Sequence, residues 1–255
     1  MSAGIYAPNP GRARLDRMLL AQTSMEVRLL LRNGEQLLLT IVIPALLLLL
    51  FSSLPIVSLG AARRVDFLTP GILALAVMST AFTGQAIATG FERRYGVLKR
   101  LGATPLPRWG LVLAKSAAVL VIELLQVVLL VAIALWLGWV PRGSPALALA
   151  VFVLGTVAFS GLGLLMAGTL RAEATLAAAN LVFILLLVGG GVVIPLSVFP
   201  GVVRAVLEYL PISALADGLR AVLQQGMAPP LLDIVALAGW AVVGVAVAGT
   251  TFRWD

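Results

Sequence analysis

The residue types that carry out most enzyme chemistry are scarce in this sequence. It has no Cys and no His, which excludes disulfides, Cys-based metal sites, and nucleophilic catalysis that depends on a Cys or His partner. The phosphate-binding pattern Gly-x-x-x-x-Gly-Lys-Ser/Thr is also missing, because no Gly-rich loop precedes either of its lysines, Lys99 and Lys115. We therefore expect no catalytic residue, no metal site and no ATP hydrolysis by this chain itself.

Three polar residues within apolar stretches could contact a transported substrate. Glu123 and Gln126 are spaced i and i+3, which places them on one face of a helix, and Asn180 lies in a later apolar stretch. Polar groups are costly inside a bilayer, so each of them is a candidate for a substrate path. The alternative for Glu123 is a packing role, in which its carboxyl group hydrogen-bonds to a neighbouring helix.

The composition places this chain in a membrane. Of its 255 residues, 61% are hydrophobic and only 11% are charged, whereas soluble proteins carry about 25% charged residues. The net charge of +7 could indicate nucleic acid in a soluble protein, but in so apolar a chain we interpret it as a topology signal. We expect an all-α membrane protein with one transmembrane domain over residues 1–255, and no nucleic-acid partner.

Uncharged runs that are long enough to cross a bilayer predict six transmembrane helices. Between the last two runs, a segment with charges and several prolines, including Pro195, Pro200 and Pro211, predicts short outer helices that are re-entrant or interfacial. The spans are expected at about 37–59, 68–91, 109–139, 146–170, 175–195 and 234–252, and the short outer helices at about 197–225.

The distribution of basic residues predicts the orientation. Most Lys and Arg fall on the same side as the N-terminus, which places both termini in the cytoplasm. Residues 13–33 predict a helix at the inner membrane surface, because apolar and basic side chains separate onto two faces; a basic flank that only sets orientation is the alternative. The polar face of this helix carries Arg14, Arg17, Arg28 and Arg32.

The densest polar segment joins the second and third predicted spans. Apolar residues recur there at helical spacing between charges, and Pro105 ends the pattern. A short amphipathic helix over about 91–104 could dock into a groove of a soluble partner; a loop that only sets orientation is the alternative. The residues expected to make this contact are Glu92, Arg93, Arg94, Tyr95, Gly96, Leu98, Lys99, Arg100, Leu101, Thr104 and Pro105.

This segment also resembles a known family. The run from Phe91 to Lys115, with its acidic-basic-x-Gly core and its Leu-x-x-Thr-Pro-Leu-Pro-Arg exit, is similar to the membrane subunits of type-2 ABC exporters, especially the daunorubicin-resistance-like drug and lipid exporters. The resemblance covers the whole chain, and the stretch from Gly189 to Pro200 resembles that family's outer helices. It implies six spans, a cytoplasmic interfacial helix, an inner coupling helix and a pair of outer helices.

The resemblance further implies a permease subunit that moves an amphipathic drug, lipid or glycolipid outward, as in multidrug efflux and antibiotic resistance. Two such subunits, identical or related, would pair with two nucleotide-binding ABC ATPase subunits. Those partners would hold ATP and Mg, while this chain would bind no cofactor. The chain would lie among the lipids of a bacterial cell membrane, and residues Glu92 to Leu101 would receive the stroke of ATP binding and hydrolysis.

Other functions remain open from the sequence. Polysaccharide exporters of related architecture fit the same pattern. An ATP-independent secondary transporter or channel would have to use Glu123, although a proton relay would lack a His or a second intramembrane carboxylate. A membrane enzyme acting on lipids would need a Ser or Lys mechanism.

Overall fold

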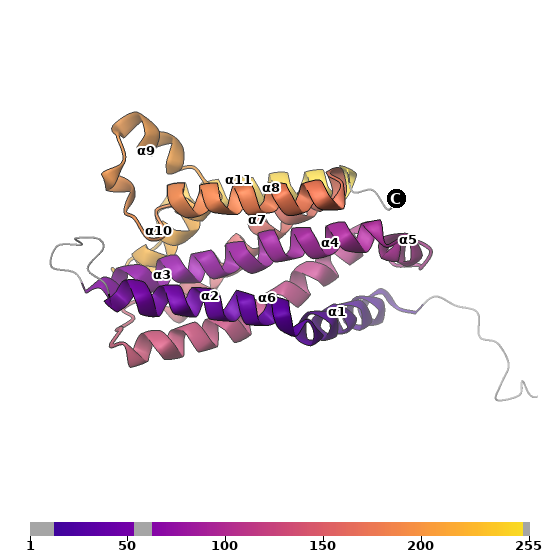
Figure 1. Cartoon of the computed structure of the whole chain (residues 1–255), viewed down its shortest axis with the longest axis horizontal. Helices are drawn as coiled ribbons and strands as arrows, with labels where there is room; N and C mark the ends of the chain where they lie inside the picture. The colour runs from indigo at the N-terminus through magenta and orange to yellow at the C-terminus, as the bar shows by residue number, and fades with distance from the viewer. Residues whose placement is uncertain (1–12, 54–62, 252–255) are drawn as a thin grey trace, which may run out of the picture.

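The computed structural model describes residues 13–53 and 63–251. Its long helices lie side by side in an elongated bundle (Figure 1), and the expected all-α fold is confirmed, since these two ranges contain no strand. The elements are α1 (Leu15–Arg32), α2 (Gly34–Ser53), α3 (Arg64–Val77), the π-helix η1 (Met78–Gly84), α4 (Gln85–Arg94), α5 (Val97–Gly102), α6 (Arg108–Trp136), α7 (Pro145–Thr169), α8 (Ala172–Gly189), the 3-10 helix η2 (Leu196–Val198), α9 (Gly201–Leu207), α10 (Pro211–Leu223) and α11 (Leu231–Thr251).

Within these residues, five helical stretches are long and apolar enough to cross a membrane. A shorter apolar stretch in α2, Thr40–Ser53, covers part of the first predicted span, and residues 54–59 of that span lie outside the described residues. The chain is thus a multi-pass membrane protein, while its sixth crossing stays a prediction. The five stretches are Arg64–Arg94, Trp109–Trp136, Pro145–Thr169, Ala172–Gly189 and Leu231–Thr250.

The continuous stretch α3–η1–α4 forms the centre of the bundle. Its most apolar part is 83% buried, whereas the corresponding parts of α8 and α11 are only 22% buried. Gly163 of α7 allows close approach to the wide turns of η1, since a Cβ atom at Gly163 would lie 2.8 Å from the Phe82 carbonyl oxygen. The central span is therefore enclosed by protein, while α8 and α11 turn apolar side chains outward.

One end of the bundle contains a separate apolar cluster. Leu98 of α5 is completely buried there with Leu106, Leu111 and Leu164, so this cluster joins α5, α6 and α7. α5 and the free end of α1 lie at this end of the bundle, and α9 projects at the opposite end (Figure 1). We name these the α5 end and the α9 end.

Glycines set three helix boundaries differently from our prediction. The single helix expected over 91–104 is divided, because Gly96 has a φ of 71° between the end of α4 and the start of α5. The third span ends at Trp136 instead of 139, before Gly138 with a φ of 86°. The fifth ends at Gly189 instead of 195, before Gly191 with a φ of 66°. Only glycine adopts such left-handed conformations without strain.

Candidate functional site

A buried charge cluster joins α1, α4 and α6 at the α5 end. Lys115 Nζ lies 2.7 Å from Glu92 Oε2 and 3.0 Å from Glu26 Oε2, and the Lys115 side chain is only 5% exposed. Gln22 Nε2 donates a hydrogen bond to the second oxygen of Glu26 at 2.8 Å. Charges this deeply buried must be paired and hydrogen-bonded. The cluster therefore holds three helices together through one ammonium group.

The next two residues of α4 attach it to α7 and α8. Arg93 Nη1 donates to the Ala167 carbonyl at 2.8 Å, and its Nη2 donates to the Leu170 carbonyl. A cation bound to the last carbonyls of a helix also interacts favourably with the helix dipole. Arg94 forms an ion pair with Glu173 in the first turn of α8. Three consecutive residues of α4 thus contact α6, α7 and α8 directly, and Lys115 connects them to α1.

The segment that follows divides into an inner and an outer face. Leu98 is completely buried and Leu101 is half-buried against this chain's own helices, whereas Tyr95 is 68% exposed. Of the predicted contact residues, those held within the chain are Glu92, Arg93, Arg94, Leu98 and Leu101. Those that remain available to a partner are Tyr95, Lys99, Arg100, Thr104 and Pro105, together with the half-buried turn residue Gly96.

α1 packs on α6 and presents its basic residues to the outside. Met18 and Leu19 pack against the apolar cluster of the α5 end. The position of α1 at a membrane surface stays a prediction. All four predicted basic residues of its polar face, Arg14, Arg17, Arg28 and Arg32, are exposed.

Two of the three candidate substrate-path residues connect helices within the bundle. Thr156 Oγ1 of α7 donates to Glu123 Oε2 at 2.5 Å, and Glu123 is completely buried. Gln126 Nε2 donates to the Thr40 carbonyl of α2, and Gln126 Oε1 accepts from Thr80 Oγ1 of η1 at 3.1 Å. These contacts fit the packing role considered for Glu123.

Asn180 lies elsewhere, on the exposed side of α8. It lines a groove of about 470 Å³ between α2, η1 and α8, together with Thr40, Ser79 and Thr83. Asn180 Nδ2 donates to the Leu176 carbonyl one turn earlier. The structure therefore separates Asn180, which lines an open groove, from Glu123, which is completely buried.

The α9 end is built around prolines and one arginine. Pro195 and Pro200 precede η2 and α9, and Pro211 is the first residue of α10, positions at which a fixed φ and a missing N–H favour helix initiation. α9 is exposed, whereas α10 is almost entirely buried.

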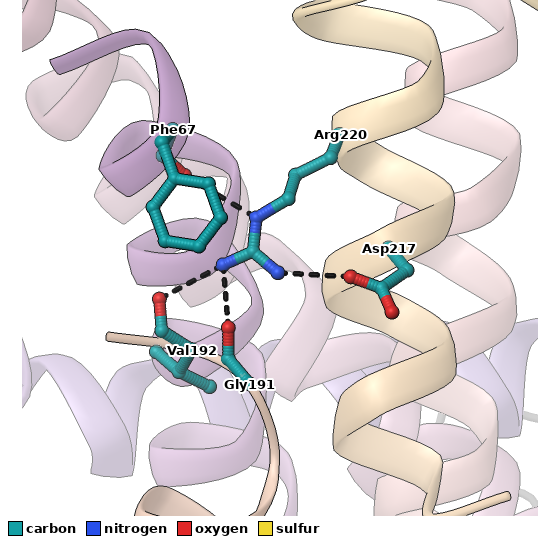
Figure 2. Close-up of polar contacts among 5 residues, drawn as sticks. All are labelled: Phe67, Gly191, Val192, Asp217 and Arg220. Atoms are coloured by element: carbon teal, nitrogen blue, oxygen red, sulfur yellow. Dashed lines mark hydrogen bonds and ion pairs between the residues drawn. The ribbon is translucent and has the colours of Figure 1, made fainter. Parts of the chain in front are cut away.

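Arg220 of α10 binds the loop that follows α8 (Figure 2). Its Nη2 donates to the carbonyl groups of Gly191 and Val192 at 2.7 and 2.9 Å, and its Nη1 donates to Asp217 Oδ1 at 2.9 Å. The guanidinium carbon lies 3.9 Å from the centre of the Phe67 ring in α3. Arg220 thereby joins α3, α10 and the end of α8.

Sequence reasoning missed Glu26 and the contacts of Arg220. The signal for Glu26 was indirect, since Lys115 lies in a predicted span and needs a buried counter-charge. Arg220 was one of several scattered charges in the outer segment, and its carbonyl partners have no side-chain signature. Among the described residues, no group of three or more acidic side chains gathers in a way that could hold a metal ion.

Comparison with known proteins identifies a family for most of this chain. Residues 18–223 match the family described as ABC-2 type transporter. The matched range begins in α1 and ends at the last residue of α10, so it includes the buried charge cluster, α5 and Arg220. No curated protein gives a significant match.

Proposed function

Because the chain belongs to the ABC-2 type transporter family, we propose that it is the permease subunit of an ABC exporter whose α5 receives force from a separate ATPase subunit. One observation carries the proposal. The charged end of α4 is attached to the surrounding helices, while Tyr95, Lys99 and Arg100 around α5 remain exposed. An element that is fixed on one side and free on the other is suited to transmit movement from a partner.

The contacts of α4 define how such movement would spread. Glu92 is connected to α6 and α1 through Lys115. Arg93 binds the end of α7, and Arg94 binds the start of α8. A push on α5 would therefore act on four helices at once. Packed helices respond to such forces by rigid-body shifts more readily than by local deformation.

The polar groove between α2 and α8 is our candidate for the substrate path. Its walls include Asn180 and Thr40, and apolar side chains such as Ile43 and Ile184 lie exposed on the same two helices. We propose that a second copy, or a related permease, packs against this face. An amphipathic drug, lipid or glycolipid would then pass outward between the two subunits, with Asn180 as a polar contact.

The same proposal fixes the orientation in the membrane. The α5 end would face the cytoplasm, where ATPase subunits lie, and the α9 end would face outward. Both termini would then be cytoplasmic, and the chain would lie in a bacterial cell membrane, with ATP and Mg held by the partner.

Co-purification tests the partnership. The tagged chain, extracted gently from its native membranes, should bring down a soluble P-loop ATPase in equal amount. Changing Tyr95→Ala and Lys99→Glu together should release the ATPase without loss of folded chain, because both side chains are exposed. Val202→Ala is the matched control, since Val202 is 84% exposed on α9. An ATPase that is absent from the wild type, or retained equally by both variants, would contradict the proposal.

A further inference from the structure

A second cavity lies beside the buried charge cluster, between α1, α4 and α6. Its volume is about 470 Å³, within the range of about 300–1,000 Å³ typical of small-molecule sites. Asn33, η1 and α4 line both this cavity and the groove at Asn180, but α6 lines only this cavity and α8 lines only the groove. Its polar lining includes Glu26, Thr80, Gln85, Thr89, Glu92 and Lys115.

One face of α4 supplies three of these polar groups. Gln85, Thr89 and Glu92 are spaced i, i+4 and i+7, so they follow one another along one side of the helix. Gln85 is 6% exposed, and neither its Nε2 nor its Oε1 has a hydrogen-bond partner among the described residues; the same holds for Thr89 Oγ1. Buried amide and hydroxyl groups are nearly always hydrogen-bonded, so these atoms indicate an occupant.

The net charge of the lining residues determines whether the cavity favours a cation or an anion. Glu26 and Glu92 share the single ammonium group of Lys115, which is the only cation among the lining residues. The two carboxylates therefore exceed the positive charge by one. This arrangement favours a cation and disfavours a phosphate or carboxylate group.

Apart from Asn33, the remaining lining is mainly apolar and aromatic, and it reaches the surface. Leu29 is 52% exposed, and Phe91 stacks on Tyr95 with 6.2 Å between ring centres. Aromatic rings bind cations through their faces, and leucines along the rim suit a hydrocarbon chain. The cavity thus combines a polar, negatively charged interior with an apolar exit.

We propose that this cavity binds the primary ammonium head of an amphiphile, whose tail leaves along Leu29 and Leu30. An –NH3⁺ group has three hydrogens, which match the Glu92 carboxylate, Gln85 Oε1 and Thr89 Oγ1. A quaternary ammonium of the same charge has no hydrogen to donate. The site goes beyond the proposed export function, and it requires neither the ATPase nor a second copy.

The site also has a mechanical consequence. Glu92 belongs both to the cavity wall and to the charge cluster that holds α4 on α6. An ammonium group beside Glu92 would compete with Lys115 for the same carboxylate, so occupancy acts on the helix that continues into α5.

A binding experiment on the purified full-length chain tests the site. Dodecylammonium is titrated into the protein in a neutral maltoside detergent and followed by calorimetry, with dodecyltrimethylammonium and dodecyl phosphate as comparison ligands. We expect one dodecylammonium to bind per chain. Dodecyltrimethylammonium should bind at least about tenfold more weakly, and dodecyl phosphate should not bind. Each lost hydrogen bond in a desolvated site accounts for roughly tenfold in affinity.

Matched variants locate the binding. Gln85→Leu and Thr89→Val each remove unpartnered polar atoms at nearly constant volume, and each should weaken dodecylammonium by about tenfold or more. Gln225→Leu is the control, because Gln225 is exposed between α10 and α11. If Gln85→Leu does not fold, Thr89→Val decides the question. Equal affinity of dodecylammonium for the wild type and Thr89→Val would overturn the proposal. So would the absence of dodecylammonium binding, because the cavity would then hold only water.

A separate experiment identifies the natural ligand that carries the ammonium group. Native mass spectrometry of the chain extracted from membranes distinguishes a retained lipid that carries a primary amine from a soluble amine that binds only on addition. Both results support the same site. Retention of lipid that is unchanged in Gln85→Leu and Thr89→Val would contradict it.

Discussion

Lys115 is the residue on which the arrangement of the α5 end depends most. Its ammonium group compensates Glu26 and Glu92, neither of which has another ion-pair partner among the described residues. Removing it leaves two carboxylates near the centre of the helix contacts. The cost of such a buried, unpaired charge exceeds the net contribution of the intact pair.

Lys115→Met should therefore lower the free energy of unfolding by about 3–5 kcal/mol. Thermal unfolding in detergent measures the effect. Lys99→Met removes the same charge from an exposed position of α5, and we expect a change of no more than about 0.5 kcal/mol. Equal effects of the two substitutions would show that the cluster does not hold the helices together.

Arg220 has a comparable role at the α9 end. Its planar guanidinium donates to the Gly191 and Val192 carbonyls and to Asp217 at the same time, and it stacks on Phe67. A lysine keeps the positive charge, but it lacks the several fixed N–H donors of the guanidinium group and its planar surface for stacking.

We expect Arg220→Lys to destabilise the chain by about 1–3 kcal/mol, because carbonyl groups that were hydrogen-bonded become unpaired. The loop after α8 should also become sensitive to protease, which limited proteolysis detects. Arg204→Lys is the control, since Arg204 pairs with Glu208 on exposed α9 and such pairs contribute about 0–1 kcal/mol. A protease-resistant Arg220→Lys protein with wild-type stability would contradict this role.

Single residues show where prediction from sequence ends. The exposed state of Lys99 follows from local pattern, because charged residues surround it. For Glu123, the sequence left both a substrate path and a packing role open, because its apolar neighbours do not indicate which side of the helix faces the bundle. The pairing of Lys115 with Glu26 spans 89 residues, and that of Arg220 with Phe67 spans 153. Such contacts depend on tertiary packing, which no local pattern encodes.

Among the elements, α7 and α11 approach each other backbone to backbone. A Cβ atom at Gly161 would lie 2.8 Å from the Gly244 carbonyl carbon, and one at Gly244 would lie 2.9 Å from the Leu162 nitrogen. Both neighbours are backbone atoms, which cannot move aside without a shift of the whole helix. Close backbone approach of this kind is a main source of helix association in membranes.

Gly161→Ala should consequently destabilise the bundle by about 1–3 kcal/mol, the usual cost of overpacking. Gly239→Ala is the matched control on α11, because no atom lies within 4 Å of its Cβ position. The control should be neutral or stabilising by up to about 1 kcal/mol, since alanine favours the helix. Thermal unfolding compares the two, and a Gly161→Ala protein as stable as Gly239→Ala would refute the close packing.

Elements differ in how well the sequence predicts them. The spans over α7 and α11 follow from long uncharged runs, whose hydropathy is a local property. The division of the predicted 91–104 helix could not be predicted from the sequence. Glycine can adopt several backbone conformations, and the left-handed one found at Gly96 is only one of them. The π-helical turns of η1 have no local signature either, and they lie where η1 packs closely against Gly163.

For the whole molecule, the two ends have different constructions. The α5 end combines a buried charge cluster, a polar cavity and an exposed short helix, and the α9 end is closed by α10 and Arg220. This asymmetry fits the proposed exporter, in which force would enter at the α5 end and substrate would leave at the α9 end. The family match covers both ends, while the direction of transport and the partner's contact surface are our proposals.

The central claim is that the exposed face of α5 contacts the ATPase subunit. The chain has no native cysteine, so Lys99→Cys introduces a unique site for a short photoactivated cross-linker, and Val202→Cys introduces the matched site on α9. In native membranes, Lys99→Cys should give an adduct that contains a P-loop ATPase, and Val202→Cys should give none. An ATPase adduct from Val202→Cys, or its absence from Lys99→Cys in membranes where the ATPase is present, would contradict the claim.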